Sequence, residues 1–139
     1  MKTINISQEN KRRLLKTDPD VDRDDIITKH IDSAEPTVLI SPSLHLGLDL
    51  KDDLSRFAII VKMPYANLGD RWINARYNSP NGKKWYSWLS ALHLVQAYGR
   101  SVRSETDWAH TYVLDSEFRR FVNMNRIILP GWFLEGIQS

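Results

Sequence analysis

Two apolar, β-branched runs constrain the fold more than any other feature of the sequence. Residues 37–41 read TVLIS and residues 57–64 read FAIIVKMP, and both runs are almost continuously apolar. Runs of this kind are typical of strands that are covered on both faces, as in a parallel sheet. Pro42 and Pro64 end the two runs, because proline cannot donate a hydrogen bond to a strand ladder. The sequence therefore predicts a buried, mostly parallel sheet.

The rest of the chain alternates helical and strand patterns. Ser116 suits a helix N-cap, with Glu117 in the first turn. Strand, connection, strand, helix, strand and helix follow one another, and this order predicts an α/β fold. Residues 1–36 are interpreted as a polar N-terminal segment with a short helix, belonging to the same domain as residues 37–139. Beyond the two apolar runs, the expected elements are a helix over 24–34, a long helix over 85–100, a strand over 110–115 and a helix over 116–125.

Composition excludes several classes of function. The chain has no cysteine, so disulfides, thiolate metal sites and an iron–sulfur cluster within it are excluded. Its net charge of +2 permits an anionic partner without requiring one. The N-terminus has no apolar leader region and no stretch is apolar enough to span a membrane, so a cytoplasmic protein without a membrane partner is expected.

No metal site is expected either. Asp18, Asp20 and Asp22 imitate the start of a calcium loop. Arg23 stands where that loop needs glycine, and Lys29 stands where it needs a bidentate glutamate. The four histidines show no ligand spacing.

The long predicted helix begins apolar and ends cationic. Trp85, Leu89 and Leu92 share a stripe with the polar group Gln96, Arg100 and Arg103, which spans roughly 60° on a helix. An arginine fork meets phosphate oxygens bidentately. Gly99 lies inside the pattern, where it costs about 1 kcal/mol relative to alanine, and this favours a close approach by a ligand or partner.

A purely structural interpretation of these arginines stays open on spacing alone. They suit the end of a helix, where the dipole favours cations, and Glu105 or Asp107 could pair with them. Asp107 is expected to be a structural partner of Arg100 or Arg103 and not a catalytic acid, because the sequence places no second carboxylate to work with it.

Two motifs carry a family resemblance. Residues 96–115, QAYGRSVRSETDWAHTYVLD, resemble motif VI of superfamily 2 DNA helicases, Q-x-x-G-R-x-x-R followed by an acidic residue and a strand. Residues 38–65, VLISPSLHLGLDLKDDLSRFAIIVKMPY, resemble the motif V region, in which a G-x-D-L loop precedes an apolar strand ending in K-x-P-[FY]. The XPD/DinG type is the most similar variety.

The resemblance implies specific roles. The fold would be the second RecA-like domain, a P-loop NTPase-like three-layer sandwich. Arg103 would be the arginine finger, Arg100 a second contact to the terminal phosphate of ATP, and Gln96 an organiser of the hydrolysis site. Gly47 and Asp49, with Gly99, would couple the nucleotide site to DNA.

The chain lacks what the first RecA-like domain supplies. No G-x-x-x-x-G-K-[ST] loop is present to cradle phosphates, and no acidic motif is present to hold magnesium. The family's opening strand would also lie upstream of Met1, so the domain is expected to be truncated on that side. The expectation is therefore half a helicase motor. It would bind ATP and Mg²⁺ only together with the missing first domain, and would not hydrolyse ATP alone.

A basic and aromatic segment follows the second apolar run. Stacking aromatics beside cations are how single-stranded DNA is held without sequence preference. Trp85 and Trp88 are assigned to the core instead, and a core and solvation role for the whole segment stays open. The candidate DNA contacts are Arg71, Arg76, Lys83 and Lys84 in this segment, with Ser41 and Ser43 after the first strand.

A rival interpretation belongs to another class of function. The chain would then keep the helicase fold as a non-catalytic module that binds nucleic acid or protein. An unpaired sheet edge and five tryptophans could also support self-association through exposed apolar surface.

Overall fold

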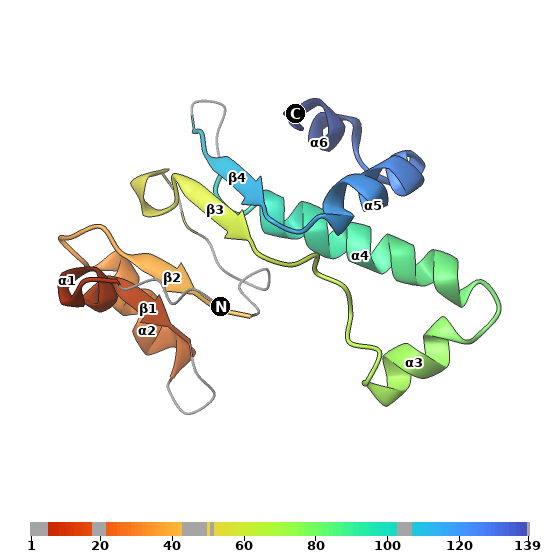
Figure 1. Ribbon diagram of the computed structural model, residues 1–139, viewed down its shortest axis with the longest axis horizontal. Helices are drawn as coiled ribbons and strands as arrows, with labels where there is room; N and C mark the ends of the chain where they lie inside the picture. The colour runs from red at the N-terminus through yellow and green to blue at the C-terminus, as the bar shows by residue number, and fades with distance from the viewer. Residues whose placement is uncertain (1–5, 18–21, 43–49, 51, 103–106, 139) are drawn as a thin grey trace. The chain divides into compact units, whose positions relative to one another are not determined.

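A computed structural model describes residues 6–17, 22–42, 50, 52–102 and 107–138. Contacts divide the chain into two compact units, residues 1–44 and residues 45–139. Each unit combines helices with a pair of parallel strands, so the expected α/β class and the parallel pairing are confirmed (Figure 1). The expectation that residues 1–36 belong to the same domain as residues 37–139 stays a prediction. No helix in the described ranges is long and apolar enough to cross a membrane.

The first unit is built around two short parallel strands. Its elements are α1 (Gln8–Arg12), β1 (Leu14–Lys16), α2 (Arg23–Ile31) and β2 (Val38–Ile40). Strand β1 pairs with β2, with Leu14 opposite Val38. The sequence pattern predicted α2 and β2 but not α1 and β1, because two leucines between charged residues give too short a signal. Asp22 is the N-cap of α2, and its carboxylate accepts a hydrogen bond from the Asp24 amide at 2.9 Å.

The second unit carries the longest helix and a second pair of strands. Strands β3 and β4 are parallel, with Phe57 opposite His110 and Ile60 opposite Val113. Helix α4 lies against one face of this pair, with α5 beside it (Figure 1). The elements are η1 (Asp52–Leu54), β3 (Phe57–Ile60), α3 (Arg71–Tyr77), α4 (Gly82–Tyr98), β4 (His110–Val113), α5 (Glu117–Asn125), η2 (Arg126–Ile128) and α6 (Gly131–Glu135).

The expectation that the apolar strands are covered on both faces is wrong for β3. Burial alternates along β3 and along β4, as in a sheet with one open face. Phe57, Ile59 and Tyr112 are each more than half exposed, at 52%, 51% and 55%. The opposite face is the packed one, where Ile60 contacts the core. An apolar run alone could not distinguish one covered face from two.

The core of this unit lies between α4, α5 and the C-terminal helix α6. From α4 it takes Ala91 and Leu94, with Val95 and Tyr98 packed beside them. The buried face is therefore not the predicted stripe of Trp85, Leu89 and Leu92. Trp88 is also half exposed, against its assignment to the core. The buried cluster comprises Met63, Ala91, Leu94, Phe121, Val122, Leu129 and Phe133.

Helices α3 and α4 form a hairpin that the sequence did not predict. The sequence predicts no helix over residues 71–77, because seven residues before a proline turn give a weak periodic signal. The Asp70 carboxylate starts α3 by accepting hydrogen bonds from the amides of Trp72 and Ile73, at 2.8 and 3.1 Å. Asn81 then takes the left-handed conformation, with φ of 62°, and turns the chain into α4.

Asp115 joins the end of β3 to the start of α5. Its carboxylate accepts hydrogen bonds from the backbone amides of Met63, at 3.0 Å, and Glu117, at 3.1 Å. These two bonds lower the pKa of the Asp115 carboxyl. Ser116 is the N-cap residue by position, but its side chain makes no capping bond. The cap predicted for the Ser116 side chain is therefore supplied by its neighbour.

We expect Asp115→Asn to destabilise the chain at neutral pH and to have a smaller effect in acid. Because the folded pKa lies below the unfolded value, the carboxylate contributes stability above about pH 4. That contribution is lost as the pH falls through the folded pKa. Urea unfolding at pH 7 and near pH 3 measures the difference, with exposed Glu135→Gln as the control. An equal effect of Asp115→Asn at both pH values would contradict the assignment.

Candidate functional site

The helix that was expected to carry all three phosphate-facing residues ends before two of them. Helix α4 ends at Tyr98, and Gly99 is its C-cap, with φ of −79° and an amide that donates to the Val95 carbonyl at 3.0 Å. Gln96 therefore lies on α4, whereas Arg100 lies in the turn after it. Arg103 is outside the described residues. The predicted single helical face for the three is corrected, because glycine favours a helix terminus over a helix interior.

Gly99 is not required by the fold itself. A Cβ at this position would meet the Val95 carbonyl oxygen at 3.4 Å, an ordinary van der Waals contact. Its φ is also one that any residue adopts. Because Gly99 is the C-cap and not a helix-interior residue, the predicted helix-interior cost does not apply, and a close approach of a partner or ligand stays a prediction.

Aromatic packing fixes the end of α4. The Tyr98 ring makes an edge contact with Phe133, with ring centroids 5.2 Å apart. It also stacks on Trp132, with centroids 6.0 Å apart. Both partners belong to α6. The last residue of α4 is thus held immediately before the turn that carries Arg100.

The chain after α4 is attached to the segment that leads into β3. The Ser101 and Ser55 hydroxyls form a hydrogen bond, and Ser101 is only 2% exposed. Arg56 Nη1 donates to Asp107 Oδ1 at 2.7 Å, and the Asp107 side chain is 1% exposed. Asp107 is therefore part of a structural ion pair, and its predicted pairing with Arg100 or Arg103 stays a prediction. The arginine in this ion pair is Arg56, not one of the two that the sequence suggested.

Arg56 is a centre of several interactions. Its Nε donates to the exposed Asp53 carboxylate at 2.9 Å, and its Nη1 donates to the Trp108 carbonyl at 2.9 Å. The guanidinium also lies 5.0 Å from the centroid of the Trp108 ring. Hydrogen bonds to Asp53 and then to Asp107 raise the pKa of Arg56. Sequence reasoning missed Ser55 and Arg56, because their partners are 46 and 51 residues away.

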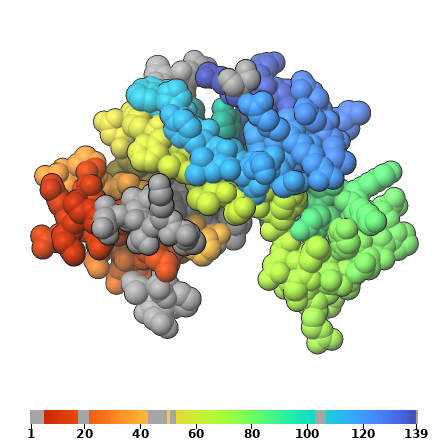
Figure 2. All heavy atoms as spheres, in the orientation of Figure 1, coloured from red at the N-terminus to blue at the C-terminus, as the bar shows by residue number. Residues whose placement is uncertain are grey.

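The α3–α4 hairpin gathers the predicted DNA contacts of the second unit. Arg71 and Arg76 lie on α3, Lys83 and Lys84 lie in the first turn of α4, and all four are exposed. In Figure 2 the hairpin, drawn in green, forms a lobe of this unit. Its α3 also presents Trp72, which is 86% exposed. The Arg76 guanidinium lies 5.7 Å from the centroid of the Trp85 ring.

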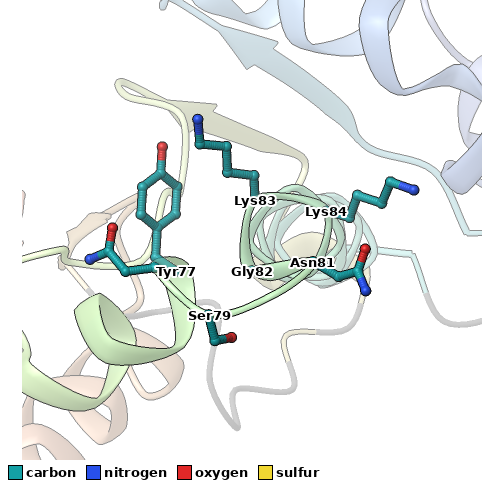
Figure 3. Close-up of a pocket in the computed structure, with 7 residues that line it drawn as sticks. Tyr77, Ser79, Asn81, Gly82, Lys83 and Lys84 are labelled. Atoms are coloured by element: carbon teal, nitrogen blue, oxygen red, sulfur yellow. The ribbon is translucent and has the colours of Figure 1, made fainter.

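A hollow of about 370 Å³ lies at the turn between the two helices. Figure 3 shows Lys83 and Lys84 extending in different directions from the start of α4, with Lys83 on the side of Tyr77. The lining residues are Tyr77, Asn78, Ser79, Asn81, Gly82, Lys83 and Lys84.

Comparison with known proteins then decides the family. Residues 2–135 match the model of the family described as "Helicase C-terminal domain". The chain belongs to that family. The chain is similar to the Fanconi anemia group J protein homolog of Gallus gallus, with 28% identity over 66% of the present chain. The matched part is about 8% of that relative's length. The helicase resemblance of the two sequence motifs is thereby confirmed.

Several predicted residues of the helicase C-terminal domain are not placed by the structure. Arg103, Gly47, Asp49 and Ser43 lie outside the described residues. Ser41 is half-buried directly after β2 in the first unit. Across the described ranges, no group of three or more histidine or acidic side chains could hold a metal ion.

Proposed function

We propose that this chain is the C-terminal half of an ATP-dependent DNA helicase of the XPD/DinG kind. ATP and Mg²⁺ would be bound by a first RecA-like domain, and this chain would complete the site with Gln96, Arg100 and Arg103. The observation that carries the proposal is the family match over residues 2–135, combined with the motif VI residues at and after the end of α4.

Positioned arginines suit this role chemically. In phosphoryl transfer, charge spreads over the oxygens of the transferred group, and an arginine finger stabilises that charge. The fork of a guanidinium can contact two oxygens at once. The loop with Gly47 and Asp49 would pass the state of the nucleotide site on to DNA.

The α3–α4 hairpin supports contact with single-stranded DNA. Residues 71–98 contain four basic and no acidic residues, whereas the net charge of the whole chain is only +2. The hairpin therefore has a net charge of +4, whereas the rest of the chain has a net charge of −2, and this local excess would attract a polyanion. The most exposed tryptophan of the described residues, Trp72, lies on the same hairpin and could stack on a base.

We expect Trp72→Ala to weaken binding of single-stranded DNA by roughly 5- to 150-fold, because stacking on one base contributes about 1–3 kcal/mol. Fluorescence anisotropy with a labelled oligonucleotide measures the affinity. If Lys83 contacts one phosphate, Lys83→Ala should make the plot of log affinity against log salt concentration shallower by a slope of about 0.7. Met124→Ala on α5, where the side chain is 73% exposed, is the matched control. Equal affinities for Trp72→Ala and the control would contradict a stacking role.

ATP turnover tests the helicase proposal itself. The chain is assayed with saturating single-stranded DNA, first alone and then with a first RecA-like domain of the same family supplied in trans. We expect turnover only in the mixture. If the mixture stays inactive under conditions where the two domains bind each other, the role in ATP hydrolysis is wrong.

The alternative function is a non-catalytic binding module, and the open face of the β3–β4 pair favours it. Phe57, Ile59 and Tyr112 present contiguous apolar surface there. Such a face could bind a protein or a second copy of the chain. Salt distinguishes the two functions, because DNA binding weakens steeply with salt whereas apolar association does not.

A further inference from the structure

Ser55 and Arg56, the two residues that precede β3, contact the chain between α4 and β4 at two described positions. Ser55 is hydrogen-bonded to Ser101, and Arg56 is paired with Asp107. Ser101 immediately follows Arg100, and Asp107 lies four residues after Arg103 in the sequence. Arg100, which is expected to face ATP, is therefore adjacent in the chain to a residue attached at Ser55.

Both attachment points are buried, which makes their geometry costly to change. Ser101 is 2% exposed, and the Asp107 side chain is 1% exposed. A buried carboxylate requires its partner, because an unpaired buried charge is strongly unfavourable. The contact also continues into the sheet, where the His110 amide donates to the Arg56 carbonyl at 3.0 Å.

We propose that Ser55 and Arg56 are positioning residues for Arg100, the motif VI arginine that the structure describes. This proposal rests on the proposed function, since it assumes that Arg100 and Arg103 meet the phosphates of ATP. Catalytic groups must be held within about 0.5 Å of their productive position. A displacement of about 1 Å can reduce the rate by roughly 100-fold. In this proposal Ser55 and Arg56 act through Ser101 and Asp107 and not on the nucleotide itself.

Arginine at position 56 is specific for this task. Its guanidinium donates to Asp53, Asp107 and the Trp108 carbonyl together. The ammonium of lysine is a point charge on a flexible stem and does not reproduce this planar arrangement. Arg56→Lys should therefore keep the charge but lose most of the positioning.

Hydrogen exchange on the chain itself tests whether the contacts fix the segment. In Arg56→Ala, amides of residues 100–102, 107 and 108 should exchange at least about tenfold faster, whereas those of α5 should not change, since local opening is set by local contacts. Ser55→Ala provides a second variant if Arg56→Ala does not fold. Arg120→Ala is the matched control, because it removes an exposed ion pair with Glu117 at 3.6 Å in the same unit. Equal exchange in Arg56→Ala and Arg120→Ala would overturn the proposal.

ATP turnover in the mixture with a first RecA-like domain tests the catalytic consequence. Arg56→Ala and Arg56→Lys should lower kcat by about 100-fold and leave KM for ATP within about threefold, because the loss is of transition-state geometry. Added guanidinium ion should partly restore kcat in Arg56→Ala. Faster exchange with unchanged kcat would overturn the positioning role. An inactive mixture with the unmodified chain would instead refute the proposed function, and the exchange result would still decide whether the attachment exists.

Discussion

Gly82→Ala is expected to destabilise the second unit more than alanine would at its other described glycines outside α6, which are Gly69, Gly99 and Gly136. A Cβ at this position would lie 2.2 Å from the carbonyl oxygens of both Arg76 and Tyr77, and 2.6 Å from the Tyr77 carbonyl carbon. These are backbone atoms at the end of α3, so no side chain can rotate away to relieve the clash. The two helices would have to separate, or the last turn of α3 would have to unwind. Overpacking of this kind typically costs about 1–3 kcal/mol, and occasionally more.

Urea unfolding followed by tryptophan fluorescence measures this loss. Gly131→Ala is the matched control, because a Cβ there meets no atom within 4 Å and the residue is exposed at the start of α6. The control should be neutral or slightly stabilising, since alanine suits a helix better than glycine. Similar free energies of unfolding for the two variants would mean that the hairpin does not close around Gly82 as the structure shows.

Arg103→Ala is expected to reduce ATP turnover by roughly 1,000- to 100,000-fold in the mixture with a first RecA-like domain, the range found for arginine fingers. Arg100→Ala should also lower kcat, because a second contact to the terminal phosphate would be lost. The physical reason is the same in both variants. Negative charge that develops on the phosphoryl oxygens loses a fixed positive partner in a site that excludes water.

The chain alone gives the sharpest test of the half-motor interpretation. We expect no ATP turnover above the blank with saturating single-stranded DNA, with or without Arg103→Ala. Arg120→Ala on α5 serves as the control for loss of a surface arginine, and should retain full activity in the mixture. Turnover by the isolated chain that disappears in Arg103→Ala would show a complete nucleotide site, and the half-motor interpretation would be wrong.

Local patterns in the sequence predicted the elements that depend on local physics. Helix α4 was expected over 85–100 and is found over Gly82–Tyr98, and α5 was expected over 116–125 and is found over Glu117–Asn125. Apolar spacing and helix-end residues act within a few positions along the chain, so the sequence displays them directly. The motif V and VI patterns likewise predicted the helicase family, which the match over residues 2–135 confirms.

The sequence did not predict the α3–α4 hairpin, because the contacts that stabilise it are tertiary. Seven residues of α3 become a helix where Asp70 caps them and α4 packs against them, and Gly82 matters only because another backbone lies beside it. The burial of α4 shows the same limit. Several of its faces are apolar, and only its neighbours decide that Ala91 and Leu94 are inside while Trp88 is half exposed.

The sequence by itself determined the α/β class, the parallel strands, the family and the identity of the residues proposed to meet ATP. The tertiary structure alone decided which residues contact Ser101 and Asp107, near those residues in the chain. Asp107 looked like a partner for a neighbouring arginine, yet it pairs with Arg56, 51 positions away. The physical reason is that a hydrogen bond or an ion pair depends on distance in space. Folding brings Ser55 and Arg56 to Ser101 and Asp107 through the β3–β4 pairing, and no local pattern records that approach.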